Sequence, residues 1–166
     1  MIRSAIPADA RPIAEVHVRT WQEAYRGIVA DGVLDALDVD ERERSWDQWL
    51  GTPPDGVETF VADEEDGVVV GFVNVGPDRG GERGVGELYA IYLREACWGR
   101  GIGRALMERA VAALSAAGYH EAVLWVLADN VRTRRFYEAA GWAADGAEQE
   151  LEGLGLPEVR YRRCLG

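Results

Sequence analysis

The second half of the chain alternates between strand and helix signals, and this alternation constrains the fold more than any other feature. Residues 85–93 and 122–127 are short apolar runs typical of buried strands. Helical spacing of apolar residues follows each run, over 101–117 and 131–140, and a glycine follows each helix. A strand, a helix and a second strand in this order predict a parallel pair of strands joined by a crossover helix.

The first half of the chain predicts strands that pair without a crossover. Residues 57–62 and 68–75 are apolar runs separated by an acidic turn, which is a hairpin signal. A short strand is predicted over residues 2–6. Two helices are predicted between that strand and the hairpin, one capped by Asp9 and one over residues 40–50.

The tail completes the expected fold with two weaker strands. They lie within residues 142–165, on either side of a glycine-rich turn. The whole order predicts an α/β fold whose mixed, mostly antiparallel central sheet has six to seven strands and about four flanking helices. A length of 166 residues is enough for a real core, so we expect one domain spanning residues 1–166.

Composition excludes several classes of function. The chain has 18 basic and 29 acidic side chains, a net charge of −11 and no basic run. This balance argues against nucleic acid and against an anionic membrane surface as partners. The chain also has no lysine, which excludes a phosphate-binding P-loop lysine and Schiff-base chemistry.

The scarce nucleophiles and metal ligands exclude further classes. No two of His17, His120, Cys97 and Cys164 stand at a metal-ligand spacing, so we expect no metal. None of the three serines lies in a G-x-S-x-G context, which excludes an α/β-hydrolase elbow. No membrane-spanning run and no apolar leader is visible, and we therefore expect a cytoplasmic protein.

The most informative segment is residues 98–106, Trp-Gly-Arg-Gly-Ile-Gly-Arg-Ala-Leu, between a predicted strand and a predicted helix. Glycines let a ligand approach the backbone, and a helix N-terminus offers unpaired N–H groups, so a diphosphate fits here. A Gly-x-Gly pattern alone can equally be a structural turn. A Rossmann dinucleotide site would need a small residue where Leu106 stands and a position after the first strand, which disfavours that interpretation.

A second segment, residues 130–142, reads Asn-Val-Arg-Thr-Arg-Arg-Phe-Tyr-Glu-Ala-Ala-Gly-Trp. Together the two segments resemble the GCN5-related N-acetyltransferase (GNAT) superfamily, whose core carries Q/R-x-x-G-x-G/A and, after the next strand, Asn…Phe-Tyr-Glu…Gly-Phe. The resemblance is dense over residues 85–142. It implies a sheet splayed between its fourth and fifth strands, with acetyl-CoA in the opening as cosubstrate. It also implies direct transfer of the acetyl group to a primary amine, and it allows a homodimer.

The resemblance assigns three groups of residues to acetyl-CoA. The end of the fourth strand would line the pantetheine and acetyl groups with its backbone, at Ile91, Tyr92 and Leu93. The loop would bind the pyrophosphate through N–H groups, at Gly99, Arg100, Gly101, Ile102, Gly103 and Arg104. Asn130 would meet the pantetheine arm, and Trp98 stands where the family usually has Gln or Arg.

Two residues are implied in the chemistry. Tyr137 matches the tyrosine that protonates the departing CoA thiolate. Glu87 matches a fourth-strand glutamate that acts as base in one branch of the family, directly or through a water, whereas the fifth-strand position used in another branch is Trp125 here. Two alternatives stay open: Glu87 can be a solvated ion-pair partner, and His17 can be the base.

The acceptor is the least constrained part. The first helices flank the acceptor cleft in this family, so Trp21 and Tyr25 are expected to shape the amine pocket. A small-molecule or peptide amine fits, and the acidic surface favours cationic amines in general. One alternative is a non-catalytic acyl-CoA sensor, which would tolerate loss of Glu87 and Tyr137. Another is a dinucleotide-binding oxidoreductase module.

Overall fold

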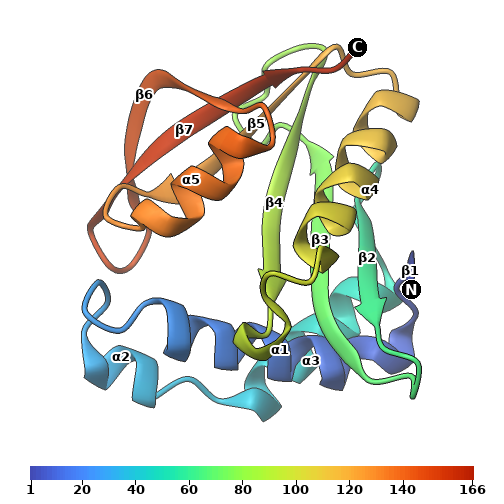
Figure 1. Ribbon diagram of the computed structural model, residues 1–166, viewed down its shortest axis with the longest axis vertical. Helices are drawn as coiled ribbons and strands as arrows, with labels where there is room; N and C mark the ends of the chain where they lie inside the picture. Colours follow the sequence, from blue (N-terminus) through green and yellow to red (C-terminus); the bar gives the residue numbers. More distant parts are fainter.

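A single seven-stranded sheet organises the computed structural model, which describes all residues from 1 to 166 (Figure 1). The strands lie in the order β1-β2-β3-β4-β5-β7-β6, and every neighbouring pair is antiparallel except β4 and β5. Their bounds are β1 Ile2–Ser4, β2 Glu58–Asp63, β3 Val69–Pro77, β4 Val85–Leu93, β5 Glu121–Leu127, β6 Ala143–Leu151 and β7 Leu156–Cys164. The predicted fold class is confirmed, including the parallel pair at the crossover.

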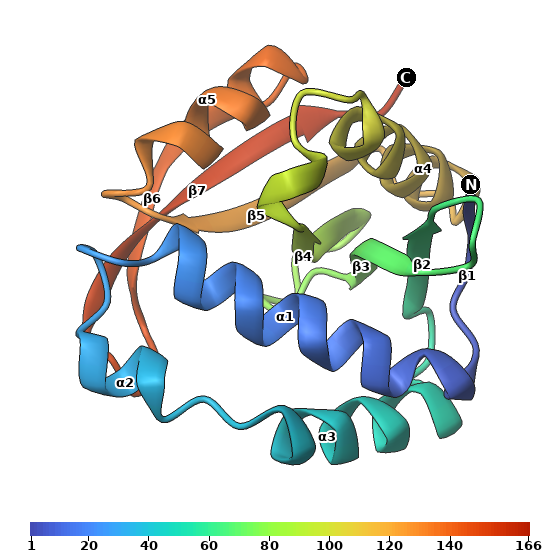
Figure 2. The same ribbon diagram turned by 60° about the horizontal axis from the view of Figure 1, so that its bottom comes forward.

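Five α-helices connect and cover the strands. They are α1 Ala10–Ala24, α2 Asp31–Asp35, α3 Val39–Gly51, α4 Ile102–Ala116 and α5 Val131–Ala139, with short 3-10 turns η1 at Pro7–Asp9 and η2 at Glu95–Cys97. In Figure 2, α1 and α3 lie on one side of the strands, and α4 and α5 lie on the opposite side. None of these helices is long and apolar enough to cross a lipid bilayer.

Strand β2 shows how both faces of the sheet are buried. Phe60 and Ala62 belong to the core under α4, whereas Val61 between them belongs to the core under α1 and α3. All three are almost completely inaccessible. Because successive side chains of a strand point to opposite faces, a run apolar at every position requires a covering layer on each side.

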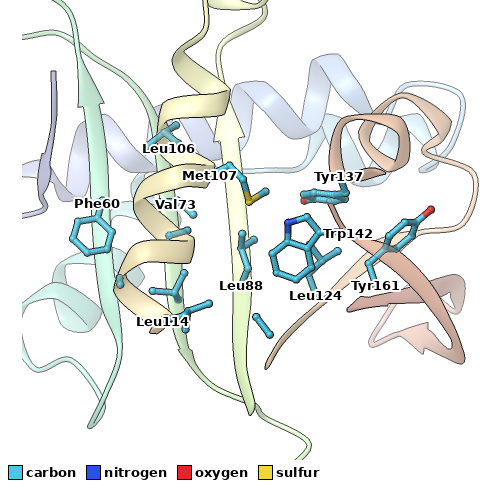
Figure 3. Close-up of a cluster of buried hydrophobic side chains, with 14 of the residues drawn as sticks. Phe60, Val73, Leu88, Leu106, Met107, Leu114, Leu124, Tyr137, Trp142 and Tyr161 are labelled. Carbon is cyan, nitrogen blue, oxygen red and sulfur yellow. The ribbon is translucent and has the colours of Figure 1, made fainter. Parts of the chain in front are cut away.

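The larger core lies between α4 and the sheet (Figure 3). Leu106, Met107, Ala110 and Leu114 recur at helical spacing and form the buried stripe of α4. Figure 3 shows Tyr137 from α5 beside Trp142 and close to Tyr161 of β7, at the far end of the same core. The core therefore packs α4, α5 and the sheet together beneath the segment between β4 and α4.

One helix was not predicted, and one predicted cap was wrong. Helix α2 was not predicted, because five residues containing a glycine carry too little periodic signal. Asp9 does not cap α1: the 3-10 turn η1 places it inside a continuous helical path, and its side chain accepts from the N–H of Ile6 and the guanidinium of Arg3. The second predicted helix, α3, is capped instead by Asp38, which accepts from the N–H of Glu41.

Candidate active site

The sheet opens between β4 and β5. These strands pair only over Val85–Glu121, Gly86–Ala122 and Glu87–Val123, after which β4 continues beside β3 and β5 continues beside β7. The divergence is visible in Figure 1. One backbone edge of β4 from residue 88 to 93 is therefore left without a strand partner, and such an edge can hydrogen-bond a ligand.

A cleft of about 1140 Å³ occupies this opening. It brings together most of the residues singled out in the sequence: Trp21, Tyr25, Glu87, Ile91, Tyr92, Leu93, Gly99, Gly101, Gly103, Arg104, Asn130 and Tyr137 line it. Arg100 and Ile102 do not. The Arg100 guanidinium turns away to Glu64 at 2.7 Å, and Ile102 packs against the larger core.

The loop before α4 offers a row of free N–H groups to the cleft. Gly99 and Gly101 adopt φ angles of 74° and 82°, a left-handed conformation that a side chain would disfavour. None of the N–H groups of residues 99–104 donates to a backbone acceptor, and the first such bond in α4 comes from Ala105. A row of free donors at the N-terminus of a fifteen-residue helix suits a diphosphate.

Trp98 holds this loop against the end of β4. Its indole N–H donates to the carbonyl of Leu93 at 2.9 Å, and the guanidinium of Arg132 from α5 lies 3.6 Å from its ring centroid. The Trp98 side chain thus ties the loop, β4 and α5 together. No side-chain role was expected for Trp98, because the family usually has Gln or Arg at this position.

Asn130 caps α5 from the wall of the cleft. Its side-chain oxygen accepts from the N–H of Thr133 at 3.3 Å, and the residue is almost fully buried. Because the oxygen serves the helix, the amide NH₂ is the part of this side chain available to a ligand.

Tyr137 is buried at the base of the cleft, and its hydroxyl has no hydrogen-bond partner in the protein. Burial raises the pKa of this phenol well above its ordinary value, so it keeps its proton at neutral pH. Its neighbour Tyr161 differs: that hydroxyl accepts from Arg134 and donates to Glu138. Tyr137 is therefore a protonated donor aimed at the cleft, while Tyr161 is part of the framework.

The α1 side of the cleft carries an aromatic group. Trp21 donates through its indole N–H to the Tyr92 hydroxyl at 3.1 Å, and its ring packs edge-on against Tyr25 at 4.8 Å between centroids. Burial raises the pKa of both Tyr25 and Tyr92, which are therefore neutral. The expectation that Trp21 and Tyr25 reach the cleft fits this placement, whereas Trp46 and Trp49 pack between α3 and α1 in the smaller core.

Glu87 is 1% exposed and is held by a single residue, Arg79. One carboxylate oxygen accepts from the Arg79 backbone N–H at 2.8 Å, and the other accepts from its Nε at 3.0 Å. The same contacts raise the pKa of the Arg79 guanidinium. Glu87 thus faces the cleft as a neutralised ion pair and not as a free carboxylate.

His17 lies outside the cleft. Its ring stacks on Tyr92 at 5.1 Å between centroids, and its Nδ1 accepts from the indole N–H of Trp46. Burial is the main cause that lowers the pKa of His17 to about 3. A neutral imidazole in this position supports the packing of α1 and α3.

Glu158, a buried carboxylate of β7 that also lines the cleft, belongs to no motif recognisable in the sequence. Alternation along β7 places Glu158 opposite to Val159 and Tyr161, which belong to the larger core. The alternation along β7 predicts that Glu158 lies on the face opposite to Val159 and Tyr161. It does not predict that this face lines the cleft, because that depends on the position of α1.

No group of three histidine, cysteine, aspartate or glutamate side chains is arranged to hold a metal ion. The groups that line the cleft are of three kinds. Backbone donors and arginines lie beside α4, a neutral phenol lies at the base, and aromatic rings with carboxylates lie near α1 and β7.

Comparisons with known proteins agree with this geometry. The acetyltransferase (GNAT) family profile matches residues 16–142. The uncharacterized N-acetyltransferase YuaI of Bacillus subtilis is 36% identical over 173 aligned residues, which cover 99% of this chain and 96% of the relative. Rv2775 of Mycobacterium tuberculosis, named as a probable N-acetyltransferase, is 30% identical over 97% of this chain and 91% of its own length. The chain belongs to the GNAT family and is an acyltransferase.

Among solved structures, the PaiA N-acetyltransferase of Thermoplasma acidophilum in complex with coenzyme A has the same fold, with a TM-score of 0.76. It is 18% identical, and the match covers 99% of this chain and 98% of the other. The family and the fold give no support to a non-catalytic sensor or to a dinucleotide-binding oxidoreductase module.

Proposed function

We propose that this protein transfers the acetyl group of acetyl-CoA to a primary amine of a small molecule or peptide, within the cleft between β4 and β5. The observation that carries the proposal is a loop of unpaired N–H groups at residues 99–104, whose three glycines line the cleft, together with a protonated, unpartnered phenol at Tyr137 in the same cleft. The donors suit a diphosphate, and the phenol suits a thiolate leaving group.

The pyrophosphate would sit on the loop of residues 99–104, with the guanidinium groups of Arg104 and Arg132 nearby on the cleft wall. The pantetheine arm would then run toward the base of the cleft along β4, where the backbone edge of residues 88–93 can accept and donate hydrogen bonds, apart from the Leu93 carbonyl that Trp98 already occupies. The amide NH₂ of Asn130 is available from the opposite wall.

The transfer needs one bond to form and one to break. The nitrogen of a neutral amine attacks the thioester carbonyl, and the backbone of β4 would stabilise the negative charge that develops on the carbonyl oxygen. The carbon–sulfur bond then breaks, and the thiolate takes the proton of Tyr137, whose buried hydroxyl has no protein partner to release first. The phenolate regains a proton from solvent as products leave.

The amine must lose its own protons, because an aliphatic amine is protonated near neutral pH. Glu87 remains the proposed base on β4, acting through a water, since its carboxylate lies at the cleft side of the strand that would hold the acetyl group. Arg79 occupies both oxygens, so proton acceptance competes with this ion pair.

The test is release of free thiol from acetyl-CoA in the presence of a panel of amines, which includes alkylamines, diamines, aminoglycosides, amino acids and peptides with free N-termini. The proposal expects amine-dependent thiol release above the rate of hydrolysis, with acetylated product seen by mass spectrometry. Binding of acetyl-CoA by calorimetry without turnover on any amine would contradict transfer to an amine while leaving the cofactor site in place.

A further inference from the structure

Glu158 is a buried carboxylate without a cation. Glu158 is 9% exposed, and its carboxylate accepts one hydrogen bond, from the Gln149 amide at 2.7 Å. No guanidinium lies within 4.0 Å of either oxygen. A buried charge is strongly destabilising unless it is paired, so a lone carboxylate in a cleft wall calls for a partner from outside the protein.

Two charged side chains of the cleft wall show the usual arrangement, in which each charge has a partner. Glu87 pairs with Arg79, and Arg160, two residues after Glu158 and on the same face of β7, pairs with Asp145 at 2.7 Å. Glu158 is different because Gln149 can satisfy only one of its oxygens and brings no charge. Its second oxygen therefore remains available to a ligand in the cleft.

Aromatic rings of α1 lie on the same side of the sheet as Glu158. Register places Glu158 between Leu127 of β5 and Gln149 of β6, and Leu127 packs in the same small cluster as Trp21 and Tyr25 of α1. Burial is the main cause of the raised pKa of Tyr25 and of Tyr92, and the nearby charge of Glu158 adds a smaller part, as expected for a carboxylate on the aromatic side of the cleft. A carboxylate beside aromatic faces is the arrangement that binds alkylammonium groups.

We propose that Glu158 is the ammonium-binding residue of the acceptor subsite: its free carboxylate oxygen pairs with the cationic amine of the acceptor, which lies against Trp21 and Tyr25. This assignment rests on the proposed function and narrows it to acceptors that bind as primary ammonium ions. It also explains why a buried charge persists in β7, because the acceptor completes the ion pair and excludes water from it.

The variant Glu158→Gln tests this assignment, because glutamine keeps the shape and can still accept from Gln149. We expect KM for the best amine of the panel to rise about tenfold to a hundredfold, the range for loss of a hydrogen bond to a charged group. The affinity for acetyl-CoA should not change, and the melting temperature should stay or rise, since an unpaired buried charge is removed. A merely structural carboxylate would instead lower the melting temperature and leave KM alone.

The matched control is Glu150→Gln, which removes the same charge from an exposed residue at the same end of the cleft. Because water and salt screen this charge, its removal should change KM less than about threefold. Equal effects of the two variants would overturn a specific subsite and leave only general attraction of cations by an acidic surface.

A binding measurement separates this assignment from the proposed function. With CoA bound, the wild-type protein should bind 2-phenylethylammonium at least tenfold more tightly than 2-phenylethanol, as followed by the fluorescence of the cleft tryptophans. Glu158→Gln should abolish this preference. Equal affinity for the two probes in the wild type would refute the subsite even if transfer to amines is observed, whereas absence of transfer with the preference intact would refute only the proposed function.

Discussion

The two ends of the β4–β5 cleft are built from different material. The end beside α4 consists mainly of backbone: free N–H groups over residues 99–104, held by Trp98 against β4. The end beside α1 and β7 consists of side chains, with Trp21, Tyr25 and Glu158 brought together from distant parts of the sequence. The difference shows that a site proposed for the common cosubstrate can consist of one continuous motif. A site proposed for an acceptor, which differs between enzymes, depends on the packing of separate elements.

Among these variants, Tyr137→Phe should have the largest effect on activity. Tyr137 lies at the base of the cleft, between its two ends. We expect the turnover rate to fall about a hundredfold to ten-thousandfold, because positioned proton transfer is lost. The affinity for acetyl-CoA should change little, since the hydroxyl has no protein partner whose loss would disturb the cleft. Thiol-release kinetics and calorimetry measure the two quantities.

Tyr161→Phe is the matched control for Tyr137→Phe. This neighbouring hydroxyl bonds to Arg134 and Glu138, so its removal should lower the melting temperature and leave the turnover rate nearly unchanged. A similar small loss of rate in both variants would make Tyr137 a packing residue.

Gly103→Glu should weaken binding of acetyl-CoA about a hundredfold or more while sparing the acceptor end. An added Cβ at this residue meets Phe136 and Leu93 at ordinary contact distances of 3.6 and 3.7 Å, so the backbone accepts a side chain. The carboxylate of the variant would place negative charge among the donors for the diphosphate.

Gly103→Ala separates charge from volume and should keep most of the affinity in the same calorimetric titration. If alanine abolishes binding as fully as glutamate does, the cause is steric. If neither variant changes the affinity, the diphosphate does not lie on this loop.

Much of the backbone end could be predicted from the sequence, and little of the side-chain end could. The limits of β4 are those predicted, and the helix after the glycine loop differs by one residue at each end, because apolar periodicity and glycine punctuation are local signals. Glu158 carries no such signal. Its burial and its lack of a cation follow from the register of β7 with β5 and from the position of α1, which are properties of the tertiary structure.

Glu87→Gln tests whether the Glu87 carboxylate accepts a proton from the acceptor amine or only pairs with Arg79. If Glu87 is the base, kcat/KM should fall about a hundredfold, at the lower end of the range for proton transfer. The companion variant Arg79→Gln keeps the carboxylate and removes its cation. Equal losses in both variants, with unchanged pH dependence, would show that the ion pair only orders the loop between β3 and β4.

His17→Phe should have the smallest effect on activity and act on stability. The pKa of His17 is lowered to about 3, so the unfolded chain binds a proton more readily than the folded protein does. The neutral His17 therefore contributes stability that is fully present above the ordinary histidine pKa of about 6.5 and is lost as the pH falls toward 3. Urea denaturation should therefore show a weaker loss of stability on acidification in the variant.

At neutral pH the same variant should be destabilised by about 1–3 kcal/mol, because the buried indole N–H of Trp46 loses its acceptor. A folded His17→Phe protein without activity would contradict this account and give His17 a role in the reaction.

The central claim is that free backbone donors at residues 99–104 bind the cosubstrate, and amide NMR during a titration with acetyl-CoA tests it most directly. The account predicts saturable shifts and slowed hydrogen exchange at these amides and along the β4 edge of residues 88–93, with little change at Gln149 and Glu158. Saturable binding with unchanged amides at residues 99–104 would contradict it.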